Sequence, residues 1–197
     1  MSKLLHRRQV VRALLKDRNG MMVVGGLGAP AWDITDAGDE PTSFPMWGSM
    51  GGAAMVALGA ALAQPKRKAL VITGDGEMLM GIGALATIAV QQPANLSVVV
   101  LDNEHYGETG MQRTHTGFGV DLVKVAEGCG FKRTLRVNTE EDVVKLRDMI
   151  YNQEGPLFAL VKIDAEKLPL VLPPREGSYI KNRFRIAVLG PDAVHDE

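Results

Sequence analysis

The chain of 197 residues is long enough for one domain with a substantial core, but too short for two average domains and a linker. Its composition, 46% apolar and 23% charged, is typical of a globular protein. A formal net charge of -1 gives no electrostatic reason to expect nucleic acid or an anionic membrane as a partner. One cysteine excludes an intrachain disulfide, and no apolar run approaches the roughly 20 residues of a membrane span. The polar N-terminus predicts no secretory signal, so we expect a cytoplasmic protein.

Short apolar runs alternate with helix-length segments along most of the chain. In the first half the predicted elements are a helix at residues 4–15, strands at 21–24 and 43–46, a helix of small residues at 51–63, and a strand at 68–73. In the second half they are a helix at residues 78–92, strands at 96–102, 131–137 and 157–163, and helices at 121–127 and from 138 onward.

The strands at 68–73 and 96–102 are almost continuously apolar, as expected of strands that are covered on both faces. The alternation therefore predicts an α/β fold of three layers, with a central, mainly parallel sheet between helices. We expect one domain over residues 1–164. After it, prolines and a basic stretch at 181–185 predict a tail over 165–197 that packs on the domain or on a partner subunit.

Polar residues follow two of these predicted strands directly. The first group is Gly74-Asp75-Gly76-Glu77, and the second is Asp102-Asn103-Glu104-His105. In a parallel sheet, ligands bind beyond the carboxyl ends of the strands. Glycines let a phosphate approach the main-chain amides at a helix start. Asp75, Asn103 and a main-chain carbonyl near His105 would add oxygen ligands suited to Mg²⁺.

A Gly-Asp-Gly segment alone is more often an ordinary turn. With Asn103 following 28 residues after Asp75, the pair resembles the thiamine-diphosphate (ThDP) binding motif. The resemblance implies that Asp75, Asn103 and the main-chain carbonyl of His105 hold Mg²⁺. It also implies that Gly74, Gly76 and Glu77 lie at the diphosphate, with the amides of Gly76 and Glu77 facing it.

A second match lies upstream, at Gly48-Ser49-Met50-Gly51. In related decarboxylases the first glycine accepts a hydrogen bond from the cofactor's aminopyrimidine, and the apolar residue two positions later supports its bent form. The resemblance implies these roles for Gly48 and Met50. Without the resemblance, Met50 would be read as a core methionine at a helix start.

ThDP enzymes also use a glutamate on a separate pyrimidine-binding domain. The chain has no room for a second α/β unit of that size. The resemblance therefore implies an alpha-type partner subunit that supplies the catalytic glutamate, in a dimer-based hetero-oligomer. The chain alone is expected to be inactive.

The segment from Thr109 to Thr116 refines the resemblance, because its TG-x-Q-x-T-H pattern resembles the beta subunits of sulfopyruvate decarboxylases. The C-terminal domain of phosphonopyruvate decarboxylases is similar. Both imply a small anionic 2-oxo acid as substrate, with release of CO₂ and an aldehyde. His115 or His105 is a candidate proton donor, and Arg113, His115 and Gln112 are candidate substrate contacts. Ordinary loop contacts are the alternative for each.

Three other interpretations remain. An acetolactate-synthase-like subunit would act on another 2-oxo acid, although such enzymes carry more domains on one chain. A non-catalytic ThDP-binding regulatory subunit would keep the fold without turnover. A dinucleotide fingerprint at Gly25-Gly26-Leu27-Gly28 is disfavoured, because Ala31 stands where the third glycine would be required.

Overall fold

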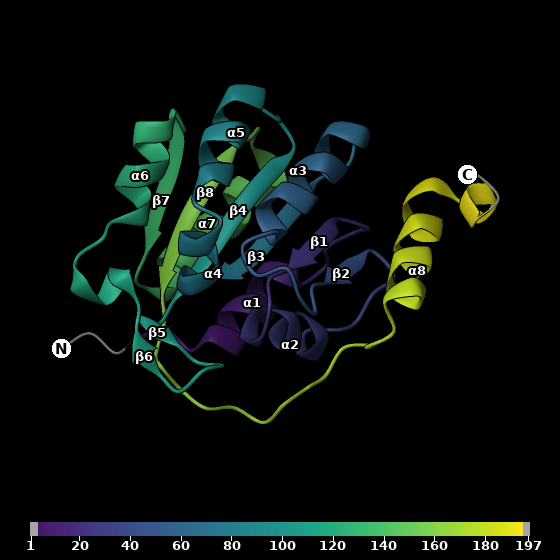
Figure 1. Ribbon diagram of the computed structural model, residues 1–197. Coiled ribbons are helices and arrows are strands. Elements are labelled where there is room, and N and C mark those ends of the chain that lie inside the picture. The colour runs from purple at the N-terminus through teal and green to yellow at the C-terminus, as the bar shows by residue number, and fades with distance from the viewer. Residues whose placement is uncertain (1–3, 195–197) are drawn as a thin grey trace.

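The computed structural model describes residues 4–194 and has a six-stranded sheet at its centre (Figure 1). All pairings within this sheet are parallel, in the order β2-β1-β3-β4-β8-β7. Its strands are β1 (Met22–Gly25), β2 (Ser43–Pro45), β3 (Ala69–Gly74), β4 (Leu96–Asp102), β7 (Arg133–Val137) and β8 (Leu157–Lys162). The predicted parallel α/β sheet is confirmed.

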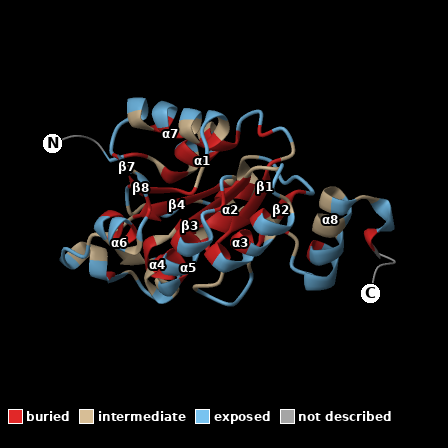
Figure 2. Cartoon of the chain, turned by 90° about the horizontal axis from the view of Figure 1, so that it is seen from above, coloured by how far each residue is buried: buried red, intermediate tan, exposed pale blue. Residues whose placement is uncertain are grey.

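Helices cover both faces of the sheet and complete the three layers (Figure 2). One face carries α3 (Ala53–Ala63), α4 (Asp75–Met80), α5 (Gly83–Gln91) and α6 (Leu122–Cys129). The other carries α1 (Arg7–Leu15), α2 (Ala29–Asp36) and α7 (Glu140–Asn152). Because neighbouring strand residues point to opposite faces, Val71 packs in the first core and Leu70 in the second.

Helix α7 begins where the sequence predicts it. The Thr139 hydroxyl accepts a hydrogen bond from the Asp142 amide, and the Asp142 carboxylate accepts one from the Thr139 amide. This reciprocal cap satisfies amide donors that the first helical turn would otherwise leave unpaired.

The single helix predicted at residues 78–92 is wrong, because the structure divides this region into α4 and α5. Between them, Gly81 packs so tightly on Gly51 that a Cβ on Gly81 would lie 2.1 Å from the Gly51 carbonyl oxygen. The close contact brings the loop before α3 against the end of α4. Helix α4 also starts earlier than predicted, at Asp75.

The remaining elements are short or peripheral. Strands β5 (His105–Tyr106) and β6 (Gln112–Arg113) form an antiparallel hairpin, followed by the 3₁₀ helix η1 (His115–Phe118). An extended segment then runs from β8 to α8 (Gly177–Leu189) and the 3₁₀ helix η2 (Pro191–Val194), beyond the edge of the sheet (Figure 1). Helix α8 was not predicted. Phe184 packs edge-on against Phe44 of β2, with ring centroids 5.4 Å apart.

Candidate functional site

A cavity of about 90 Å³ lies at the carboxyl ends of β1, β3 and β4. Strands β3 and β4 are paired with Gly74 opposite Leu101, so the residues that follow each strand meet at one edge. Met50, Asp75, Glu77 and Asn103 all line the cavity. The sheet thus brings together the two polar strand ends that the sequence singled out.

Asp75 is 2% exposed and is held from one side. Its Oδ2 accepts hydrogen bonds from the hydroxyls of Thr114 and Thr116, the latter at 3.2 Å. Burial, the largest influence, and the nearby charge of Asp102 raise the pKa of Asp75 from 3.8 to about 6, although the two hydroxyls lower it. A cation in the cavity would offset this cost of ionisation.

Asn103 is fixed by a local turn. Its Oδ1 accepts a 2.9 Å hydrogen bond from the His105 amide, while the His105 ring Nδ1 lies 2.8 Å from the Asn103 carbonyl oxygen. Glu104, between them, has a left-handed φ of 63°. This turn directs the main chain from β4 into β5 beside Asp75.

Glu77 joins the loop after β1 to the loop after β3. Its Oε2 accepts hydrogen bonds from the Leu27 amide at 2.9 Å and from the Thr73 hydroxyl at 2.8 Å. The other oxygen, Oε1, is buried without a hydrogen-bond partner in the described part of the chain. A Cβ on Gly26 would lie 1.9 Å from Oε2, so this contact requires a glycine there.

Tyr106 covers the turn after β3. A Cβ on Gly76 would lie 2.5 Å from its ring, so the glycine allows the β5–β6 hairpin to close over the cavity. Gly76 and Tyr106 both line the cavity, beside the first turn of α4.

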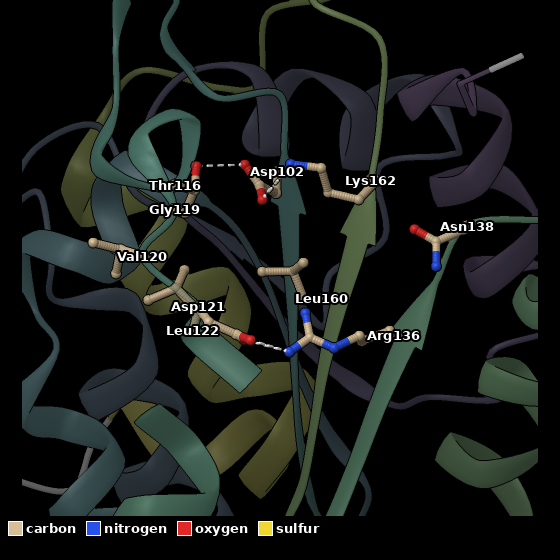
Figure 3. A pocket seen from close by; sticks show the side chains of 10 residues that line it. All are labelled: Asp102, Thr116, Gly119, Val120, Asp121, Leu122, Arg136, Asn138, Leu160 and Lys162. Carbon is tan, nitrogen blue, oxygen red and sulfur yellow. Dashed lines mark hydrogen bonds and ion pairs between the residues drawn. The ribbon is translucent and has the colours of Figure 1, made fainter. Parts of the chain in front are cut away.

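A second cavity, of about 310 Å³, opens beside Asp102 at the ends of β4, β7 and β8 (Figure 3). Asp102 accepts hydrogen bonds from Thr116 at 2.8 Å and from the Lys162 ammonium at 2.9 Å. Burial lowers the pKa of Lys162, but its hydrogen bonds to Glu104 and Asp102, together with the charges of these two carboxylates, raise it overall. The Thr116 hydroxyl therefore links Asp75 of the first cavity to Asp102 of the second by hydrogen bonds.

Most of the predicted cofactor residues line the first cavity. They are Met50, Gly74, Asp75, Gly76, Glu77, Asn103 and His105. Gly48 instead lines a separate cavity near α8.

The predicted substrate residues do not line the first cavity. Gln112 and Arg113 are exposed on β6, and His115 is exposed at the start of η1. Arg113 lies over the Phe118 ring, 4.6 Å from its centroid.

Arg7 of α1 also lines the first cavity, and sequence reasoning missed it. It lies 68 residues before Asp75, in a helix predicted only from its amphipathic pattern. No local motif signals its place at the cavity.

Within residues 4–194, no group of three or more His, Cys, Asp or Glu side chains is arranged to hold a metal ion. The same residues contain no helix that is both long and apolar enough to cross a membrane.

The family described as thiamine pyrophosphate enzyme, C-terminal TPP binding domain, matches residues 24–161. Thiamine pyrophosphate is another name for ThDP. The match includes the carboxyl ends of β1, β3 and β4 at the cavity and most of the sheet. The chain therefore belongs to this family of ThDP-binding domains.

Within that family, the chain is similar to two sulfopyruvate decarboxylase beta subunits. It is 33% identical to that of Methanothermobacter thermautotrophicus, covering 95% of this chain and 97% of the relative. With that of Methanocaldococcus jannaschii it is 40% identical over 61% of this chain and 63% of the relative. It is also 35% identical to a phosphonopyruvate decarboxylase of Streptomyces viridochromogenes, covering 87% of this chain but 43% of the relative.

A solved structure, benzoylformate decarboxylase from Polynucleobacter necessarius, has the same fold. It superposes with a TM-score of 0.71 and 21% identity, covering 84% of this chain and 34% of that chain. The chain thus spans about a third of that enzyme's length.

Proposed function

We propose that the chain is the ThDP- and Mg²⁺-binding subunit of a 2-oxo acid decarboxylase of the sulfopyruvate type. The observation that carries this proposal is the cavity that unites Asp75 and Asn103 in a chain of the ThDP-binding family. Similarity to a sulfopyruvate decarboxylase beta subunit along 97% of its length supports the substrate class. That substrate is a 2-oxo acid with a second acidic group.

Asp75, Asn103 and the main-chain carbonyl of His105 would hold Mg²⁺. A buried carboxylate and an amide oxygen are hard ligands, and phosphate oxygens and water would complete an octahedral set. The amides of Gly76 and Glu77, at the start of α4, would face the diphosphate. When bound, ThDP supplies the electron sink for loss of CO₂.

The remaining assignments concern the reacting end of the cofactor. Gly48 would accept a hydrogen bond from the aminopyrimidine, and Met50 would support the bent cofactor. His105 or His115 would donate a proton to the product. Gln112, Arg113 and His115 would reach the substrate only if the partner subunit extends the site toward them, because they do not line the cavity.

Exposed apolar side chains on the loop before α3, on α3 and at the end of α4 support the need for a partner subunit. These residues, called the apolar surface, are Trp47, Met50, Met55, Val56 and Met80, and Met80 is 68% exposed. Met50 lines the cavity, and the neighbouring loop packs on the end of α4, so the surface reaches the site. Methionine-rich surfaces suit protein contacts. The partner would be the alpha-type subunit that supplies the catalytic glutamate.

The test is to purify the chain with a co-expressed pyrimidine-binding subunit and measure CO₂ release. Sulfopyruvate, phosphonopyruvate and pyruvate are compared in the presence of ThDP and Mg²⁺. We expect activity on sulfopyruvate only in the complex, and its loss in folded Asp75→Ala and Asn103→Ala variants. If the complex binds no ThDP, the proposal is wrong.

Phosphonopyruvate decarboxylation is the second candidate, because a phosphonopyruvate decarboxylase is 35% identical over 87% of this chain. Preferential turnover of phosphonopyruvate would favour it. ThDP binding without turnover of any 2-oxo acid would instead favour a non-catalytic regulatory subunit.

A further inference from the structure

Arg7 is the only lysine or arginine among the described residues that line the candidate cavity. Its side chain is buried, with 5% of the residue exposed. It also lines a neighbouring cavity of about 260 Å³, together with Asn103 and Glu108. A buried cation thus faces both cavities at the edge of the proposed cofactor site.

One edge of the Arg7 guanidinium is used within the chain and the other is not. Its Nη1 donates to Asp33 Oδ2 at 2.5 Å and to the Ala29 carbonyl oxygen at 3.4 Å. Nε and Nη2 have no hydrogen-bond partner among residues 4–194. The Asp33 contact holds the group in place while leaving donors for a ligand.

The surrounding ion pairs leave a positive excess. Asp33 also accepts a hydrogen bond from Arg8 Nε at 3.0 Å, so two guanidinium groups share one carboxylate. Asp36, the other carboxylate of the cluster, pairs with Arg12 at 2.6 Å and lies 3.7 Å from Arg8. Three arginines therefore face two aspartates, and an added anion would balance the charge.

The chain places one of its own carboxylates near this excess charge. Glu108, in the β5–β6 hairpin, lies so close to Gly28 that a Cβ there would be 2.8 Å from Glu108 Oε1. Its carboxyl has no hydrogen-bond partner within the described residues. Burial raises the pKa of Glu108, and the charge of Arg7 opposes that effect.

We infer that Arg7 forms a subsite for an oxyanion through Nε and Nη2, and that Glu108 must give way when the anion binds. A guanidinium edge matches a phosphate or sulfonate with two parallel hydrogen bonds. The inference rests on the proposed function, since the anion would be the diphosphate of the cofactor or the acidic group of the substrate. Either source presents the same chemistry to Arg7.

The experiment uses the full chain assembled with its partner subunit. It compares Arg7→Gln, Arg7→Lys and Glu108→Gln with Lys16→Gln, which removes an exposed cation at the C-terminal end of the same helix, outside the arginine–aspartate cluster. Calorimetry gives the Kd of ThDP with Mg²⁺, and kinetics gives KM for sulfopyruvate and for pyruvate. Circular dichroism and thermal unfolding identify any variant that fails to fold.

We expect Arg7→Gln to weaken binding of one anion by about 10- to 100-fold, with partial retention in Arg7→Lys. A higher Kd for ThDP identifies the diphosphate as the ligand. A higher KM for sulfopyruvate but not for pyruvate identifies the acidic group of the substrate. Glu108→Gln should tighten the same ligand by about threefold, because a competing charge is removed. Misfolding could not produce that gain.

Two results would overturn the subsite. The first is ThDP and sulfopyruvate affinities in Arg7→Gln and Glu108→Gln that match those of Lys16→Gln within about twofold. This would leave the proposed function intact. If the unmodified complex binds no ThDP, the proposed function fails, and titration with magnesium pyrophosphate decides Arg7 alone. Loss of pyrophosphate binding in Arg7→Gln would support the subsite. Absence of pyrophosphate binding by the unmodified complex would overturn it.

Discussion

The carboxylate of Glu77 accepts a 2.9 Å hydrogen bond from the main-chain amide of Leu27, fifty residues earlier in the chain. This bond crosses from β1 to β3, where the order of the sheet reverses direction. In open α/β sheets, ligands bind in the crevice at such a reversal. The Glu77–Leu27 bond therefore sets the separation of the two loops that flank the cavity.

Replacing Glu77 with Ala should destabilise the chain by about 1–3 kcal/mol, because the Leu27 amide and Thr73 hydroxyl lose their acceptor. Glu77→Gln keeps an acceptor oxygen and should stay closer to the unmodified chain. Urea unfolding measures both, and calorimetry should show weaker ThDP binding in the alanine variant. Equal stability of the two variants would contradict the role of this bond.

Asp75 should make the stability of the metal-free chain depend on pH. Its folded-state pKa of about 6 lies above 3.8, so ionisation favours unfolding as the pH rises through this interval. Asp75→Asn removes the effect. The free energy of unfolding of Asp75→Asn, taken relative to that of the unmodified chain, should therefore increase by about 1 kcal/mol from pH 5 to pH 7.

Urea unfolding with a chelator at both pH values checks the Asp75 prediction. A stability difference that does not change with pH would contradict it. Adding Mg²⁺ and ThDP to the complex should reverse the order of stability of the unmodified protein and Asp75→Asn. Only the carboxylate form binds the metal well.

Met80→Glu should prevent assembly with the partner subunit. Met80 is 68% exposed within the apolar surface, and a charge placed in such an interface is desolvated without a partner. The matched control is Val144→Glu, because Val144 is 71% exposed on α7, on the opposite face of the sheet. Co-purification and sedimentation measure assembly, and equal assembly of both variants would place the interface elsewhere.

Lys162→Met should destabilise the chain by about 1–3 kcal/mol, because it leaves the buried carboxylate of Asp102 without its cation. Adding Asp102→Asn should restore part of the loss. Thermal or urea unfolding of the two single variants and the double variant gives the coupling. If the stability losses of the two single variants add up to that of the double variant, the Lys162–Asp102 pair contributes no interaction energy to stability.

Several features of the sheet and cavity were predictable from local patterns. The runs at 68–73 and 96–102 are buried β3 and β4, since almost continuous apolar sequence favours strands covered on both faces. Asp75 and Asn103 follow from this, because parallel pairing brings the ends of adjacent strands together.

Other elements carry little local signal. Helix α2 has Pro30 in its first turn and is only eight residues long. Helix α8 buries only Ile180 fully, so it lacks a broad apolar stripe. The place of Arg7 depends on how α1 docks beside α2, and no spacing within α1 encodes it.

The strand order also has a consequence for synthesis of the chain. Strand β7 hydrogen-bonds within the sheet only to β8, which follows it in sequence and separates it from β4. As the chain leaves the ribosome, β1 to β4 can pair in turn, whereas residues 133–137 must wait for residues 157–162. The loops that carry Asp75 and Asn103 can therefore be brought together before the sheet is complete.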